Sequence, residues 1–183
     1  ASEALAKDLR LPLRRSGGNA MSRYNWRLGN TNRGSDYFFE RGVFPNENID
    51  TFVAQDRRTG TKSLLTVPML GWVAKSTTLT CGFSTTKYGA QQQTDPFNPT
   101  CGNGLKPDGT PITGNDPRDT SVAVNATFAS DWITSLVTKY GRADAGGVRY
   151  YAFDNEPALW NSTHRDVHPA PLSYDELLQR TID

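Results

Sequence analysis

The residues best suited to chemistry in this chain form the tetrapeptide Asp154-Asn155-Glu156-Pro157. The preceding run GVRYYAF (147–153) is rich in β-branched and aromatic residues, which is typical of a strand. Asp and Asn favour turns, and Pro157 biases Glu156 away from a helix. The strand therefore ends near Asp154. Since catalytic groups of parallel α/β barrels lie at the C-terminal ends of strands, we predict that Glu156 is a general acid. The alternative is an ordinary loop carboxylate that caps a helix.

The elements that must position Glu156 alternate along the chain. Helices are predicted over 2–10, from Asn46 or Asn48 to Gly60, over 122–140 and from Ser173 onward. Strands are predicted over 11–16, 62–70 and 147–154. This alternation indicates parallel pairing and an α/β fold. Residues 75–118 have no periodic pattern, which predicts a long loop that is either functional or disordered.

The size of the chain predicts an incomplete domain. Three strands cannot close a (β/α)8 barrel, which needs roughly 250 residues, whereas this chain has 183. We therefore expect residues 1–183 to be a single incomplete piece of a TIM-type barrel domain.

The charge, hydropathy and cysteine content of the chain limit which partners and surroundings can be predicted for it. The net charge is +1 and no run of Lys or Arg occurs, so nothing favours a nucleic-acid partner. No window of 18 residues is apolar enough to predict a membrane span. The two cysteines, Cys81 and Cys101, form either a disulfide or two free thiols, and an oxidising, secreted setting would favour the disulfide.

Three long blocks point to a known family: LRRSGGNAMSRYNW (13–26), KSLLTVPMLGWVAK (62–75) and YYAFDNEPALWNSTH (150–164). In content and order they resemble glycoside hydrolase family 44, which comprises bacterial endoglucanases and xyloglucanases. The resemblance implies a secreted, extracellular enzyme. It also implies that the strands here are the second to fourth of the barrel. The remaining strands and a β-sandwich are expected outside this chain.

The resemblance also implies roles for individual residues. Glu156 matches the acid/base, and Asn155 matches the residue that binds the sugar 2-hydroxyl. Arg14 resembles the arginine that steadies the nucleophile, with Arg15 as the rival candidate. Asn19 is placed to touch the reactive sugar. The nucleophile itself, a Glu after the seventh barrel strand, is expected outside these 183 residues.

Four aromatic residues follow the ends of predicted strands, where their faces could stack on glucosyl rings: Trp26, Trp72, Trp160 and Tyr24. The alternative is that they pack the loops. No cofactor is expected for catalysis. Family members can carry structural calcium, and Asp95 in the long loop is the candidate ligand.

The function predicted from these residues is retaining endo-β-1,4-glucan hydrolysis, with β-glucan and the remainder of the catalytic domain as partners. The isolated piece is expected to be inactive. Two alternatives stay open. One is a xyloglucanase, xylanase or mannanase of the same family, and the other is a carbohydrate-binding fragment without catalytic activity.

Overall fold

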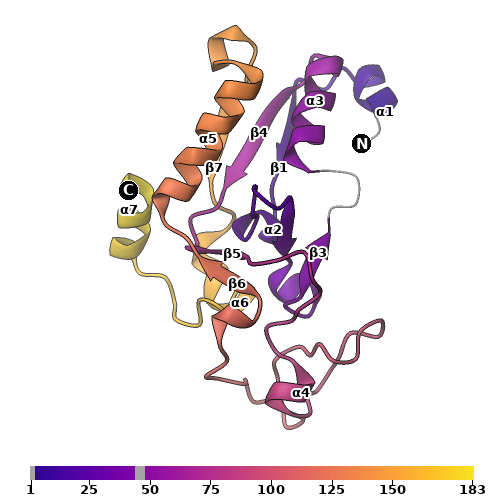
Figure 1. Cartoon of the computed structure of the whole chain (residues 1–183), viewed down its shortest axis with the longest axis vertical. Helices are drawn as coiled ribbons and strands as arrows, with labels where there is room; N and C mark the ends of the chain where they lie inside the picture. Colours follow the sequence, from indigo (N-terminus) through magenta and orange to yellow (C-terminus); the bar gives the residue numbers. More distant parts are fainter. Residues whose placement is uncertain (1–2, 44–47) are drawn as a thin grey trace.

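A computed structural model describes residues 3–43 and 48–183, and its centre is a three-stranded parallel sheet. The strands are β1 (Leu13–Ser16), β4 (Lys62–Val67) and β7 (Tyr150–Phe153), in the order β1-β4-β7. Helix α3 (Ile49–Thr59) connects β1 to β4, and α5 (Ala126–Tyr140) connects β4 to β7 (Figure 1). The parallel register pairs Leu13 with Lys62 and Leu64 with Tyr150. The predicted α/β alternation is confirmed, and the described sheet is open rather than closed into a barrel.

Two of the described α-helices begin at a residue whose side chain caps the first turn. Asn48 Oδ1 accepts the Thr51 backbone N–H at 2.8 Å at the start of α3. Gly60, with φ 74°, ends α3 in the left-handed conformation that favours glycine. Ser173 Oγ accepts the Glu176 N–H at 3.1 Å and starts α7 (Tyr174–Ile182). The first helix, α1, spans Glu3–Asp8; Ala1, Ser2 and the alternative cap Asn46 lie outside the described residues.

Helix α5 is shorter at its start than the sequence predicts. Residues expected to open it form β6 (Ser121–Ala123), which pairs antiparallel with β5 (Trp72–Ala74). This pairing brings together the two ends of the long segment 75–118. A second antiparallel pair, β2 (Asn30–Asn32) and β3 (Arg41–Val43), lies in the segment between β1 and α3. The remaining short elements are α2 (Asn19–Ser22), η1 (Gly34–Tyr37), η3 (Ala143–Ala145), η4 (Pro157–Leu159) and α6 (Trp160–Thr163).

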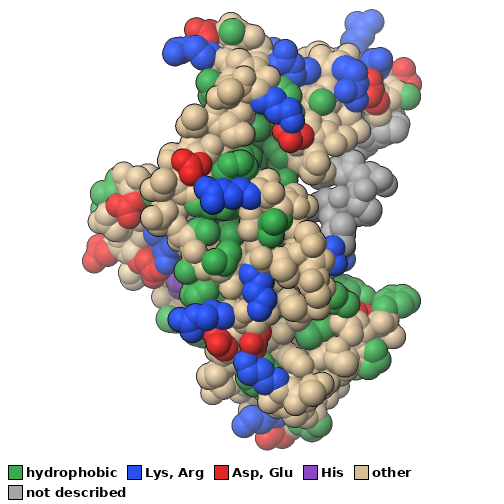
Figure 2. All heavy atoms as spheres, in the orientation of Figure 1, with side chains coloured by type: hydrophobic (Ala, Val, Ile, Leu, Met, Phe, Trp, Pro, Cys, Tyr) green, Lys and Arg blue, Asp and Glu red, His purple; other side chains and the backbone are tan. Residues whose placement is uncertain are grey.

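One face of the sheet packs against α3 and α5. The core joins Leu65 and Val67 of β4 to Phe52 and Val53 of α3 and to Trp132 of α5. Apolar surface nevertheless remains uncovered, because Tyr150 and Phe153 on the outer strand β7 are 43% and 57% exposed. Figure 2 shows hydrophobic side chains at the surface between α3 and α5. Among the described helices, none is long and apolar enough to cross a membrane.

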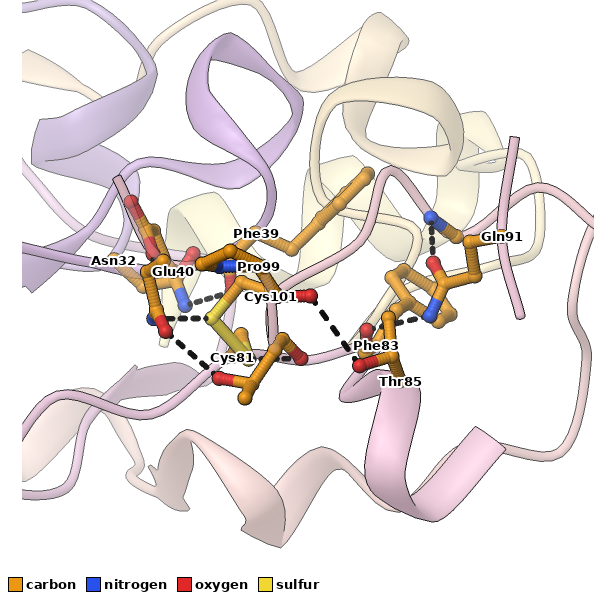
Figure 3. Close-up of a disulfide and its surroundings, with 12 residues drawn as sticks. Asn32, Phe39, Glu40, Cys81, Phe83, Thr85, Gln91, Pro99 and Cys101 are labelled. Carbon is orange, nitrogen blue, oxygen red and sulfur yellow. Dashed lines mark hydrogen bonds between the residues drawn. A yellow bond between two sulfur atoms is a disulfide. The ribbon is translucent and has the colours of Figure 1, made fainter. Parts of the chain in front are cut away.

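The long segment 75–118 is held by turns and one crosslink. It contains only α4 (Thr85–Tyr88) and η2 (Pro117–Asp119) as helical elements. Isolated β-bridges, such as the one between Ser84 and Cys101, connect different parts of this loop. Cys81 and Cys101 form a disulfide with a Cα–Cα distance of 5.4 Å (Figure 3), which decides between the two states left open by the sequence. The segment is therefore ordered without a regular sheet.

Candidate active site

Asp154 fixes the backbone at the end of β7. Its side chain is 5% exposed and accepts hydrogen bonds from the backbone N–H groups of Met69 (2.6 Å) and Leu70 (3.1 Å). Ser22 Oγ donates to its other oxygen, and the Asn155 N–H donates to that oxygen at 2.6 Å. Burial raises the pKa of Asp154, and these four donated bonds partly offset that rise. Asp154 thus joins the ends of β4 and β7 to helix α2.

Glu156 follows Asp154 by two residues. Both Asp154 (φ 57°) and Glu156 (φ 44°) adopt the left-handed conformation, which is uncommon for residues other than glycine. Such conformations persist only where the surroundings hold them, and they cluster at functional sites. The Glu156 side chain is exposed, and Asn155 Nδ2 donates to its Oε2 at 3.2 Å. Its carboxyl group is therefore positioned by a neighbour and open to a substrate.

The buried side chain of Asn155 connects Glu156 to Arg15 and Asn19, and these four residues are called the Glu156 cluster. Its Oδ1 accepts from Arg15 Nη2 at 2.7 Å and from the Gly18 N–H at 3.2 Å. Its Nδ2 donates to Asn19 Oδ1 at 3.1 Å as well as to Glu156. The double glycine permits this arrangement. Gly18 has φ 88°, and a side chain on Gly17 would collide with the Arg15 guanidinium, whose Cζ would lie 2.6 Å from the added carbon.

The two candidate arginines point in different directions. Arg15 reaches Asn155, whereas Arg14 Nε pairs with Asp56 Oδ1 of α3 at 2.7 Å. Arg14 also lies over the Phe52 ring, 3.9 Å from its centroid. Because successive side chains of a strand point to opposite faces, only one of the two can face the Glu156 cluster. Arg14 therefore lies away from the Glu156 cluster, contrary to the prediction, and the rival candidate Arg15 is the arginine that contacts Asn155.

Asn19 extends the cluster toward the segment between β1 and α3. Its Nδ2 donates to Asp36 Oδ1 at 2.8 Å, while its Oδ1 accepts from Asn155. The structure therefore brings together Glu156, Asn155, Asn19 and Arg15, and adds Asp36 in η1. No spacing in the sequence connects Asp36 to Asn19, so only the fold could reveal it.

The four predicted sugar-stacking residues do not gather at this cluster. Tyr24 is 3% exposed, packs against Trp132 in the core, and accepts the Ile49 N–H. Trp160 is fully buried beside Leu70 and Val167. Both predictions were wrong, because a buried ring cannot present its face to a sugar. Trp26 and Trp72 are half-buried: Trp26 Nε1 donates to the Phe128 carbonyl at 3.1 Å, and Trp72 packs against the Trp160 cluster.

Asp95 belongs to a second polar group, around the disulfide. Its Oδ1 accepts from the Tyr37 hydroxyl at 2.7 Å and from the Phe97 N–H at 3.0 Å, and its side chain is 2% exposed. Burial, followed by the charge and hydrogen bond of Asp95, raises the pKa of Glu40 to about 7. Burial also acts to raise the pKa of Asp95, but the bonds from Phe97, Tyr37 and Glu40 lower it on balance. Below about pH 7, Glu40 therefore holds a proton beside an ionised Asp95.

Figure 3 shows Glu40 beside the disulfide. Sequence reasoning missed this pair, because Glu40 and Asp95 are far apart in the chain. Within the part of the chain that the structure describes, no three His, Cys, Asp or Glu side chains come together in a way that could hold a metal ion.

Comparisons with known proteins agree with the blocks quoted above. The profile of glycoside hydrolase family 44 matches residues 30–183. The solved structure of CelM2, a bifunctional glucanase-xylanase from a metagenome library, is 42% identical with a TM-score of 0.95. It covers all of this chain, which spans 37% of the CelM2 chain.

Two further relatives are more distant. The Paenibacillus polymyxa xyloglucanase structure of family 44 is 28% identical over 96% of this chain and 35% of its own, with a TM-score of 0.67. The β-mannanase/endoglucanase A of Caldicellulosiruptor saccharolyticus is 27% identical over 93% of this chain. This chain spans only 13% of that relative's length.

Proposed function

Since the chain belongs to glycoside hydrolase family 44, we propose that it supplies the acid/base side of a retaining endo-β-1,4-glucanase. Glu156 protonates the glycosidic oxygen of the leaving sugar and then removes a proton from the water that hydrolyses the glycosyl-enzyme. Retention also needs a nucleophilic carboxylate about 5–5.5 Å from Glu156. That carboxylate comes from outside these 183 residues.

The observation that carries the proposal is the Asn155–Glu156 pair at the end of β7. The two side chains lie 3.2 Å apart, and Asn155 is itself held by Arg15, Gly18 and Asn19. An acid fixed in this way loses little entropy when it meets the glycosidic oxygen. The two N–H groups of Asn155 Nδ2 bond to Asn19 and Glu156, so contact with the sugar 2-hydroxyl would require that hydroxyl to replace one of these acceptors.

The proposal includes completion of the sheet. The outer strands β1 and β7 expose Leu13, Tyr150 and Phe153, and this chain spans 37% of the CelM2 chain. We propose that further strands of the complete protein cover this surface and close a barrel. Residues 1–183 alone would then bind sugar weakly and hydrolyse nothing, because the second carboxylate would be missing.

The test is Glu156→Gln in the complete protein that carries this chain. Turnover of carboxymethyl cellulose should fall by about 10²-fold or more, because Gln cannot protonate the leaving oxygen. The first step with a dinitrophenyl cellobioside should remain fast, since that leaving group needs no proton. Glu3→Gln, a half-buried carboxylate of α1 that pairs with Lys7 and Arg58 and lies outside the Glu156 cluster, serves as the matched control. Unchanged cellulose turnover in Glu156→Gln would show that the acid lies elsewhere.

The substrate is proposed as β-1,4-glucan. The relatives' names include xylanase, mannanase and xyloglucanase, so a panel of these polysaccharides in the same assay would rank the backbones. Retarded migration in polysaccharide gels without sugar release from the complete protein would instead favour a binding protein. The Cys81–Cys101 disulfide supports a location outside the reducing cytosol, and we propose that the protein is secreted.

A further inference from the structure

Phe97 is the most exposed large hydrophobic side chain among the described residues, with 89% of its surface accessible. It follows Pro96 in the long segment, far in sequence from every residue of the Glu156 cluster. Exposed apolar side chains are common on surfaces and by themselves require no explanation. Phe97 differs because the backbone that carries it is tightly fixed.

The turn around Phe97 (residues 95–101) is held from several sides. The Phe97 N–H donates to Asp95 Oδ1 at 3.0 Å, and the Cys101 N–H donates to the Asn98 carbonyl at 2.9 Å. The Asp95 N–H donates to the Cys101 carbonyl at 2.9 Å, and Cys101 is crosslinked to Cys81. An exposed ring on such a support loses little freedom when something binds to it. Rigid presentation of an apolar face is typical of a recognition surface.

A second aromatic pair is anchored on the same carboxylate. Tyr37 donates its hydroxyl to Asp95 Oδ1, the oxygen that also accepts from Phe97. The Tyr37 and Phe38 rings meet edge to face with centroids 5.3 Å apart, and both side chains are half-buried. Phe38 (φ 46°) and Phe39 (φ 50°) are both left-handed, and Phe39 is buried against Phe83. Two consecutive strained aromatic residues mark a conformation that the surroundings enforce.

Tyr37, Phe38 and Phe97, called here the aromatic patch, are linked through the shared acceptor Asp95, and a path of hydrogen bonds and chain neighbours connects them to the Glu156 cluster. Glu156, Asn155 and Asn19 are joined by hydrogen bonds, and Asn19 bonds to Asp36, the residue before Tyr37. Polar groups border the patch: Asp36 is exposed, and the Arg33 guanidinium lies 5.6 Å from the Tyr37 ring centroid. A pyranose ring presents C–H groups on its faces and hydroxyl groups at its edges. Aromatic faces with charged hydrogen-bonding neighbours match that chemistry.

We propose that Phe97, supported by Tyr37 and Phe38, forms a remote subsite that stacks against a sugar ring of the same β-linked chain cleaved at Glu156. This inference rests on the proposed function, since it places a further ring of that substrate. The subsite would be reached only by chains longer than those that fill the cluster around Glu156. Phe97 is thus a residue that sets chain-length preference, and it takes no part in the chemical step.

The test uses the complete protein with Glu156→Gln, so that bound oligosaccharides are not hydrolysed. Calorimetry would measure Kd for cello-oligosaccharides of increasing length. Phe97→Ala should weaken binding of the longest chains about tenfold, the loss expected when one partly covered ring face is removed. The loss should shrink as the chain becomes shorter. Phe97→Trp should restore tight binding of long chains, and Leu79→Ala, a 49% exposed side chain in the same segment, should change nothing.

The outcomes separate this inference from the proposed function. If the protein with Glu156 intact releases no sugar and its Glu156→Gln form binds no oligosaccharide, the proposed function fails, and the subsite fails with it. If sugar is released but Phe97→Ala binds every chain length like its parent, only the subsite is overturned. Sedimentation adds a third readout. A dimer that Phe97→Ala converts to monomers, with unchanged sugar affinity, would assign the patch to contact between copies and overturn the subsite.

Discussion

The end of the sheet and the disulfide-closed segment each hold one exposed side chain in a fixed position, but by different interactions. At the sheet, Glu156 is positioned by three parallel strands and by Asp154, whose bonds join β4, β7 and α2. In the segment 75–118, Phe97 is positioned by local turns, one buried carboxylate and a covalent crosslink. The two regions meet where Asn19 contacts Asp36 and Tyr37 contacts Asp95. The difference indicates that the position of the proposed acid/base depends on long-range packing, whereas the position of the proposed sugar subsite depends on local turns and the crosslink.

The substitution expected to destabilise the end of the sheet most is Asp154→Ala. Four donors, including the Met69 and Leu70 N–H groups, would lose their acceptor in a buried place. The free energy of unfolding should fall by at least about 3 kcal/mol in a urea titration of the complete protein. Asp154→Asn should also destabilise, because all four bonds are donated to the carboxylate and an amide N–H₂ would face a donor. Asp144→Ala, an exposed control, should change stability by less than about 0.5 kcal/mol. Unchanged stability of Asp154→Ala would mean that the ends of β4 and β7 keep their positions without the hydrogen bonds to Asp154.

The corresponding change in the second region is removal of the disulfide by Cys81→Ser with Cys101→Ser. Closing a loop with a sequence separation of 20 should stabilise it by about 3 kcal/mol. Hydrogen exchange should accelerate across residues 83–112 and leave the amides of β4 unchanged. Dithiothreitol should reproduce the effect in the parent and have no effect on the variant. Faster exchange in β4 as well would show that the two regions unfold together.

The Glu40–Asp95 pair makes the second region sensitive to pH. The pKa of Glu40 rises from its ordinary 4.5 to about 7, first through burial and then through Asp95. Between these values the folded protein keeps a proton that the unfolded chain releases, so stability falls as pH rises from about 4.5 through about 7. The loss should be on the order of 3 kcal/mol and should level off above pH 8. Glu40→Gln should flatten this dependence in unfolding measured from pH 4 to 8, while Asp108→Asn should not. Parallel profiles for Glu40→Gln and parent would contradict the assignment.

The smallest expected effects distinguish the two arginines. Arg14→Ala leaves the carboxylate of Asp56 without its cation, and stability should fall by roughly 1–2 kcal/mol with little change in kcat. Arg15→Ala removes the 2.7 Å bond to Asn155 and should lower kcat/KM about tenfold with little change in stability. Measured on the complete protein, the opposite pattern would restore Arg14 to the site.

Much of the local structure followed from the residues themselves. Asn48, Gly60 and Ser173 marked helix boundaries because capping is a short-range interaction. The end of β7 near Asp154 followed from the turn residues and Pro157. The alternation of strands and helices similarly predicted the parallel sheet.

What the sequence determined, then, was the candidate acid/base: a carboxylate at a strand end, with Asn155 beside it. Only the tertiary structure decided which neighbours serve that carboxylate. Successive residues of a strand point to opposite faces, so Arg15 rather than Arg14 lies beside Asn155. Tyr24 and Trp160 are buried, so their rings cannot contact a sugar. The reason is physical: local patterns report which residues favour a turn or a strand, whereas burial and side-chain direction depend on contacts between residues far apart in the chain, such as Arg15 and Asn155.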